Sequence, residues 1–249
     1  MNGGVLEYCE NRGAVNANLY SGALVGVIEA GTVRYCSNSG RLYAATEIGG
    51  IVGQGAGDGK VSYCYNTGEI EAYGFGGGGI GGALYDTFAI ANCYSTGKVS
   101  GQASPYMGAP HAVVSDSYQT NTISNCYYVS ELAGVDDPNA TAVTADELKQ
   151  PEFLDRINNG EQAFVADDNN RNGGFPILGW QADRTSGVKT AGIQPAATIN
   201  LDGNTVVCDR AVSVYTIEGT LVASGNDITL APGTYVLQAG GSVKKVVVK

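Results

Sequence analysis

The chain has 249 residues, a formal net charge of −10 at pH 7 and 37 glycines without a Gly-X-Y period. An acidic surface disfavours nucleic acid as a partner, because nucleic-acid binding needs a basic footprint. Glycine at this level indicates a turn-rich β protein rather than collagen. No apolar run approaches the roughly 18 residues of a membrane-spanning helix, so we expect no membrane-spanning segment.

Cysteine marks an internal repeat in the first half of the chain. In each unit an aliphatic residue stands three positions before the cysteine, and in the first four units a glycine stands four positions after it. A fixed period of this size is the signature of stacked structural units. The repeated cysteines, which are 27, 28, 29 and 33 residues apart, are Cys9, Cys36, Cys64, Cys93 and Cys126.

Each repeat holds three short apolar stretches separated by Gly, Asn, Ser and Thr, which is typical of strands and turns. Such a unit cannot bury its own apolar face, but it can do so when it is stacked on a neighbour. We therefore predict an all-β fold in which residues 1–130 form a parallel β-solenoid of about four to five coils, with neighbouring coils roughly 4.8 Å apart.

Two rows of identical side chains should run along such a solenoid. The asparagine row, continued by Ser95, predicts a ladder at a turn, and the glycines that follow it are expected to adopt positive φ. The cysteine row allows a disulfide framework, a metal site or a column of free thiols. Metal sites use closely spaced pairs and disulfide geometry is strict, so free buried thiols are favoured, without metal or cofactor. The asparagines are Asn11, Asn38 and Asn66.

Residues 131–180 predict a helical and loop-rich cap. Thr144 and Glu147 have the spacing of a capping box, and Pro151 suits the first position of a second helix. Residues 130–170 hold ten acidic side chains against two basic ones, which we interpret as a solvated surface. The cap should cover the open end of the last coil and remove an aggregation-prone strand edge. The side chains expected to do so are Phe153, Leu154, Phe175, Leu178 and Trp180.

The last part of the chain predicts a second module. Residues 181–195 are polar and contain Gly and Pro, which indicates a linker. Residues 196–249 then predict a small β-sandwich, because short apolar stretches alternate with turn residues. The six expected strands are 205–208, 212–217, 220–223, 227–230, 233–238 and 243–249.

The repeat region resembles a known family. The segment Cys64–Gly68, together with Gly49–Gly53, is similar to the GLUG-type repeat of bacterial surface proteins, and the resemblance covers residues 3–130. It implies an adhesin-like protein, or the non-catalytic part of an IgA-cleaving metallopeptidase. Residues 108–112 depart from the pattern of the repeat, so a looser strand is expected in the fourth coil.

The C-terminal module resembles the sorting domain of the type IX secretion system of Bacteroidetes. The resemblance covers residues 196–249 and is carried by residues 214–219, 230–236 and 245–249, although the usual opening motif is replaced by Ile193–Thr198. It implies an exported protein.

Few residues could carry catalysis. His111 is the single histidine, so a His-ligated metal centre is short of ligands and the two-histidine zinc-peptidase motif is absent. Residues 167–173 have part of the pattern of a calcium loop, but the closing glutamate is missing. We assign no catalytic or metal-binding residue and do not expect an enzyme.

The tyrosines beside the cysteines are the repeated candidates for recognition. Tyr8, Tyr35 and Tyr63 precede three of the cysteines and form our candidate surface row, because aromatic rings with a polar tip are common at interfaces. The alternative is a stacked ladder that only stabilises the coils.

These patterns predict a non-enzymatic, adhesin-like protein, secreted or associated with the outer membrane at the cell surface, whose rigid face binds a glycan or a protein. One alternative is a polysaccharide-acting β-helix enzyme such as a lyase, which the scattered basic residues of the repeats disfavour. Another is a passive stalk for an upstream domain. Because a repeat begins directly after Met1 without a cap or a signal peptide, we expect an upstream part of the same chain. The basic residues of the repeats are Arg12, Arg34, Arg41, Lys60 and Lys98.

Overall fold

The computed structural model describes residues 1–106, 108–117, 120–182, 199–217, 219–239 and 242–248. The chain divides into two compact units, Met1–Asp183 and Arg184–Lys249. The predicted linker, residues 181–195, falls outside the described residues except for Gln181 and Ala182, which belong to the first unit.

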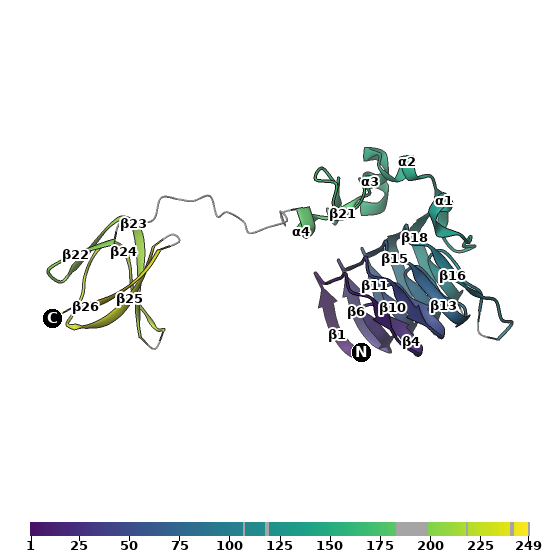
Figure 1. The fold of residues 1–249 in the computed structure, drawn as a ribbon, viewed down its shortest axis with the longest axis horizontal. Helices are drawn as coiled ribbons and strands as arrows, with labels where there is room; N and C mark the ends of the chain where they lie inside the picture. The colour runs from purple at the N-terminus through teal and green to yellow at the C-terminus, as the bar shows by residue number, and fades with distance from the viewer. Residues whose placement is uncertain (107, 118–119, 183–198, 218, 240–241, 249) are drawn as a thin grey trace. The chain divides into compact units, whose positions relative to one another are not determined.

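The first unit is built on a parallel β-solenoid of about four coils, which confirms the predicted fold class (Figure 1). The repeat positions stack in register, since Val33 pairs with Leu6 on one side and with Val61 on the other. The strands of the largest sheet are β1 (Asn2–Glu7), β2 (Glu10–Asn11), β6 (Ala30–Arg34), β7 (Ser37–Asn38), β11 (Lys60–Ser62), β12 (Tyr65–Asn66), β15 (Ala89–Ser95), β18 (Thr122–Val129) and β19 (Thr141–Val143).

Three further parallel sheets complete the wall of the solenoid. The first contains β3 (Val15–Asn16), β8 (Leu42–Ala44), β13 (Ile70–Phe75) and β16 (Val99–Gln102). The second contains β5 (Val25–Ile28), β10 (Val52–Gly55), β14 (Gly81–Leu84) and β17 (Val114–Ser117). The third pairs β4 (Leu19–Gly22) with β9 (Thr46–Gly49).

The asparagine row forms the predicted ladder. The Asn11 amide donates to Asn38 Oδ1 at 2.7 Å, and the Asn38 amide donates to Asn66 Oδ1 at 2.8 Å. Each amide also donates to the carbonyl of the glycine two residues later, as Asn66 does to Gly68 at 2.9 Å. Asn38 and Asn66 are completely buried. The ladder therefore satisfies buried amides and fixes the register between coils.

The glycines of the ladder do not adopt positive φ, so that prediction was wrong. A Cβ added to Gly68 would lie 2.1 Å from the carbonyl oxygen of Gly40 and 2.8 Å from the Asn38 amide nitrogen. Glycine is required at this position because the backbone of the preceding coil approaches it too closely for any side chain.

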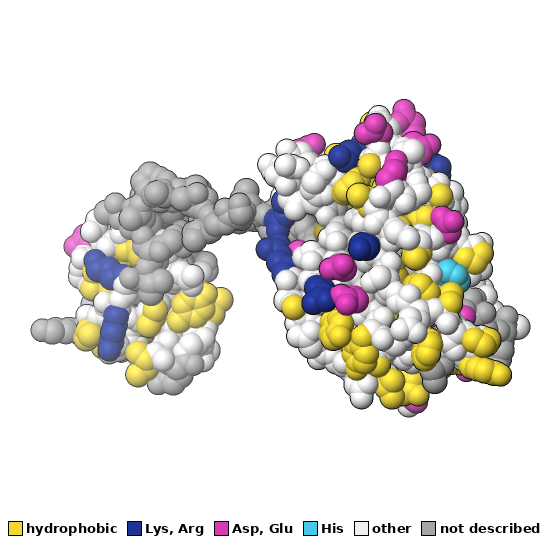
Figure 2. Space-filling model, turned by 45° about the vertical axis from the view of Figure 1, so that its right-hand side comes forward, with side chains coloured by type: hydrophobic (Ala, Val, Ile, Leu, Met, Phe, Trp, Pro, Cys, Tyr) yellow, Lys and Arg dark blue, Asp and Glu magenta, His cyan; other side chains and the backbone are white. Residues whose placement is uncertain are grey.

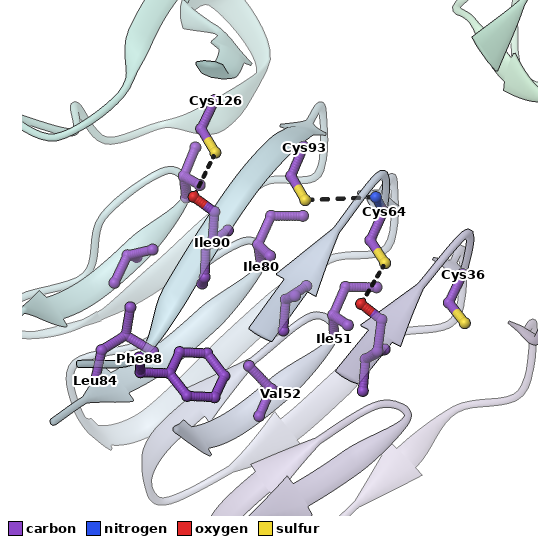
Figure 3. Close-up of a cluster of buried hydrophobic side chains, with 14 of the residues drawn as sticks. Cys36, Ile51, Val52, Cys64, Ile80, Leu84, Phe88, Ile90, Cys93 and Cys126 are labelled. Carbon is purple, nitrogen blue, oxygen red and sulfur yellow. Dashed lines mark hydrogen bonds between the residues drawn. The ribbon is translucent and has the colours of Figure 1, made fainter. Parts of the chain in front are cut away.

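The cysteines line the solenoid core, as predicted. Cys36, Cys64 and Cys93 are completely buried and form no disulfide (Figure 3). Each of these thiols donates a hydrogen bond to the carbonyl two residues earlier, and Cys93 Sγ also accepts from the backbone N–H of Cys64 at 3.4 Å. They pack in one cluster with Ile51, Val52, Ile80, Leu84, Phe88 and Ile90.

Residues 108–112, where a looser strand was expected in the fourth coil, remain bonded to the coil before them. Ala112, Val113 and Val114 are completely buried, and His111 forms a parallel bridge with Gly78. The carboxylate of Asp137 accepts the backbone N–H groups of Val113 and Val114, both at 2.8 Å. The segment that departs from the repeat motif is therefore held in register by an acid outside the repeat.

The cap covers the solenoid differently from the prediction. Its first part, α1 (Ser130–Ala133) and β19, closes the last coil, where Ala133 joins the core and β19 pairs with β18. The rest runs back along the flank of the solenoid toward β1 (Figure 1). This part contains α2 (Ala145–Leu148), α3 (Pro151–Asn158), β20 (Phe164–Val165), β21 (Ile177–Leu178) and α4 (Gly179–Ala182).

The apolar side chains of this second part of the cap, which were expected to cover the open end of the last coil, pack instead in one cluster with the tyrosines of the flank. Phe153 meets Tyr127 with ring centroids 4.9 Å apart, and Phe164 meets Tyr94 at 5.6 Å. The predicted local signals are present, because Thr144 and Glu147 form a full capping box and Pro151 begins α3.

A small β-sandwich was predicted for residues 196–249, but the described strands of the second unit form one antiparallel sheet of five strands. Its apolar side chains are buried in one cluster of their own. Six shorter strands were predicted, but two pairs of them merge into long strands and the strand at Ile199–Asp202 was missed. The strands are β22 (Ile199–Asp202), β23 (Thr205–Thr216), β24 (Leu221–Thr229), β25 (Gly233–Ala239) and β26 (Ser242–Val248).

Replacing Gly68 by alanine should destabilise the first unit by about 3 kcal/mol, because backbone and a ladder amide occupy the space of the new methyl group. Gly13 is the matched control. It has the same place in the first coil, but a Cβ there would meet only Asn11 Oδ1 at 3.8 Å. Urea unfolding of the two variants measures the difference, and equal losses of stability would contradict the stacking described here.

Thiol labelling at pH 8 should modify Cys9 quickly and leave Cys64 and Cys93 unmodified until the protein is denatured. Cys9 is half-buried, whereas burial raises the pKa of Cys64 and of Cys93 well above the usual range and closes off access to both sulfurs. Mass spectrometry after timed labelling locates the modified residues. Rapid labelling of Cys64 in the folded protein would contradict a closed core.

Candidate functional site

The candidate row of tyrosines occupies an unusual backbone position. Tyr8, Tyr35 and Tyr63 have φ of 57°, 52° and 50°, in the left-handed region, and the same position is taken by Asn92 and Asn125 in later coils. A non-glycine residue there costs about 1–2 kcal/mol, and asparagine tolerates it best. Three strained tyrosines must therefore be held by their contacts.

The three rings stack on one another. The centroids of Tyr8 and Tyr35 are 5.4 Å apart and those of Tyr35 and Tyr63 are 5.5 Å apart, with interplanar angles of 12° and 19°. Stacking covers both faces of the Tyr35 ring, so only the edge of the ring and its hydroxyl group can contact a ligand. Tyr8 is 51% exposed and is the most accessible member of the row.

A second row of tyrosines lies beneath the cap. Tyr65 and Tyr94 stack at 5.2 Å and are almost fully buried. The Tyr65 hydroxyl donates to Gln181 Oε1 at 2.9 Å, and Asn172 donates to the Tyr94 hydroxyl at 2.8 Å. This row is structural, and it anchors the cap to the flank of the solenoid.

Gln181 is the polar centre of this anchor. It is buried, its Oε1 also accepts the backbone N–H of Leu178 at 3.0 Å, and its amide donates to Ser37 Oγ at 2.9 Å. The neighbouring Trp180 donates its indole N–H to the carbonyl of Tyr35 at 2.9 Å and meets the Tyr8 ring edge-on at 6.4 Å. The sequence assigned Gln181 to a linker, because a single polar residue among polar neighbours gives no sign of burial.

The cap and the first tyrosine row enclose a pocket of about 230 Å³. Tyr8 and Tyr35 form one side, and residues 161–163 with Gly179 and Trp180 form the other. Tyr63 does not line it. Asn159 ends α3 in the left-handed conformation and Gly160 follows with φ 89°, so the chain turns sharply and brings Glu161 to the rim.

A second pocket of about 660 Å³ adjoins the first and shares Glu161, Gln162 and Gly179 with it. Its other lining residues include Leu154, Asp155, Phe164 and Val165. The two pockets together form one groove along the cap, which we call the cap groove.

The cap groove has an acidic electrostatic character. The Glu161 carboxylate is exposed, and no described Lys or Arg forms an ion pair with Glu161 or with Asp155. Burial raises the pKa of Tyr35, and the negative charge of Glu161 raises it further. Burial and Glu161 have the same effect on the pKa of Tyr63.

The arginines of the repeats are matched by carboxylates. Arg12 pairs with Glu10 at 2.9 Å, Arg34 pairs with Glu7 at 2.8 Å, and Arg41 pairs with Glu69 and Glu71. Basic and acidic side chains accordingly lie beside one another on the solenoid face in Figure 2, and acidic side chains gather over the cap at the top of the view.

The remaining polar candidates have structural partners. His111 Nδ1 lies 3.1 Å from the carbonyl of Val114, and the Asp167 carboxylate accepts the backbone N–H groups of Arg171, Asn172 and Gly174. Within the described part of the chain, no group of three His, Cys, Asp or Glu side chains could hold a metal ion. None of the described helices is long and apolar enough to span a membrane.

Comparison with known proteins agrees with this architecture. Residues 44–71 match the model of the GLUG motif. The chain is also similar to the crystal structure of "a putative immunoglobulin A1 protease from Bacteroides ovatus", with a TM-score of 0.56 and 22% sequence identity. No curated protein matches the chain.

The structural match covers 71% of this chain and 58% of the other chain. At this level of identity it shows a shared fold alone. The repeat motif and the fold together fit a β-solenoid protein.

Replacing Gln181 by leucine should destabilise the first unit by about 3 kcal/mol, because it leaves the Tyr65 and Ser37 hydroxyls and the Leu178 N–H buried without their partner. Gln162→Leu is the matched control, since Gln162 is exposed on the same cap, and it should change stability by less than about 0.5 kcal/mol. Urea unfolding measures both. Equal effects would show that the cap is not anchored through Gln181.

Proposed function

We propose that this chain is a non-enzymatic binding protein, secreted or at the cell surface, that presents the flank of its solenoid to a glycan or a protein. The observation that carries the proposal is the pocket that Tyr8 and Tyr35 form with the cap. Aromatic side chains and convergent polar groups in a concave site are the usual features of a binding surface.

A passive stalk is the competing non-enzymatic role. In a ladder that only stabilises coils, each ring would be covered as Tyr65 and Tyr94 are. Tyr35, which lies between two stacked rings, is instead only half-buried and lines the pocket with Tyr8, in a backbone conformation that asparagine tolerates better. This position at a pocket supports a role in contact with a partner.

A polysaccharide lyase is the competing enzymatic role. Such an enzyme needs cationic side chains to hold an acidic sugar and to stabilise the charge that develops during proton abstraction. The charges of Arg12, Arg34 and Arg41 are offset by neighbouring glutamates, and the pocket is lined by Glu161. This charge arrangement supports binding without catalysis.

Export belongs to the same proposal. It is supported by the GLUG match and by the sequence resemblance of residues 196–249 to a type IX sorting domain. A reporter protein fused to residues 196–249 should reach the surface of a host that carries this secretion system. If the fusion protein stays inside the cell, residues 196–249 do not act as a sorting signal.

Replacing Tyr8 by asparagine should abolish or strongly weaken binding to a glycan array or to immobilised mucin while leaving the unfolding midpoint unchanged. Asparagine keeps the left-handed conformation but removes the ring from the pocket. Tyr106→Ser is the control, because Tyr106 is 88% exposed and does not line the pocket. If both variants bind like the wild type, Tyr8 has no part in recognition.

A further inference from the structure

We infer that the cap groove binds an extended basic peptide segment, with lysine or arginine side chains directed to Glu161 and Asp155. The inference rests on the proposed binding role and specifies the partner. It follows from three features of the groove: its two neighbouring parts, its apolar lining, and two carboxylates with which no Lys or Arg of the described residues forms an ion pair.

The groove has two neighbouring parts. The two pockets, of about 230 and 660 Å³, share Glu161, Gln162 and Gly179, so an extended ligand can contact both of them. Glu161 lies at the junction, and Asp155 lines only the larger pocket. An extended ligand that contacts both parts of the groove can therefore meet both carboxylates.

The lining suits long cationic side chains. Tyr8 and Trp180 in the smaller pocket, and Leu154, Phe164 and Val165 in the larger one, offer apolar surface. Lysine and arginine place their methylene stems along such surface while their charged groups remain near water or a carboxylate.

The negative charge of the groove favours a basic partner. In the described chain no Lys or Arg forms an ion pair with Glu161 or Asp155, whereas the arginines near the tyrosine row already have acidic partners. The field of Glu161 extends over the row, since it raises the pKa of Tyr35 and Tyr63 after the larger effect of burial. An acidic sugar would be repelled, and a neutral one would leave both carboxylates without an ionic partner.

The net charge of −10 supports the same partner at longer range. Residues 130–170 alone carry ten acidic side chains against two basic ones, and this segment forms most of the groove. Such a surface attracts cationic chains and speeds their encounter at low ionic strength.

The test uses the full chain and a fluorescently labelled peptide of alternating lysine and glycine, with a glutamate–glycine peptide as the reverse-charge probe. Fluorescence anisotropy should show binding of the lysine peptide that weakens as salt rises, and no binding of the glutamate peptide. Glu161→Gln and Asp155→Asn should each weaken binding about three- to fivefold, as expected for an ion pair near the surface.

Glu152→Gln is the matched control, because Glu152 is an exposed acid of α3 that does not line either pocket. It should leave the affinity unchanged. If it weakens binding as much as Glu161→Gln, only net charge is at work and the inference is wrong.

The two proposals fail in different ways. If the lysine peptide does not bind but a glycan does so in a Tyr8-dependent manner, the basic-peptide inference is overturned and the binding role stands. If neither the peptide nor any glycan or mucin binds, both are overturned.

Discussion

The structure depends on the hydrogen bonds that join equivalent asparagines of successive coils. Each amide donates both to the next coil and to a nearby glycine carbonyl, so the ladder is satisfied only when the coils stack without a shift. The glycines that follow allow the backbones to approach, because a Cβ at Gly40 or Gly68 would overlap a carbonyl of the coil before it. The asparagines and glycines of this one turn therefore set both the register of the coils and their close approach. Coils stacked in this way bring the cysteines and aliphatic residues together in one core.

The stacking of the coils in register also gives rise to the cap groove. Because the coils stack without a shift, the residue before each cysteine always lies above its equivalent, and tyrosines at this position must stack despite a strained backbone. The residue after each cysteine forms the neighbouring row, which is buried by the cap. The groove exists because the cap covers the second row completely and only partly covers the first. Its carboxylates come from the turn after α3 and from α3 itself, outside the repeat.

Much of the solenoid could be predicted from the sequence, because a repeated position has the same environment in each coil. Five cysteines in one register were enough to indicate a buried column, and three asparagines were enough to indicate a ladder. The glycine at position 68 was interpreted as a positive-φ residue, since sequence shows that a side chain is absent but not whether dihedral strain or a neighbouring carbonyl excludes it. Local signals such as the capping box at Thr144 were also reliable, because they depend on residues a few positions apart.

The sequence also does not show on which surface of the solenoid the cap lies. Its apolar residues indicate that it covers something, but both the end and the flank of a solenoid offer apolar surface. The cap lies on the flank because of long-range contacts such as those of Gln181 with Ser37 and Tyr65. The spacing of residues in the sequence does not reveal such contacts. The three tyrosines of the candidate recognition row stack on one another, as the alternative of a ladder predicted. Only Tyr8 and Tyr35 line the pocket, because Tyr63 lies one coil further along.

The central claim is that the cap is fixed along the flank of the solenoid, since the groove depends on that docking. Hydrogen–deuterium exchange of the full chain tests it most directly. We expect peptides from residues 161–181 to exchange as slowly as those from β12 and β15, because buried groups such as the Leu178 N–H and the Gln181 side chain are bonded to each other and to the tyrosine row. Complete exchange of residues 161–181 within seconds, while β12 and β15 remain protected, would contradict the account.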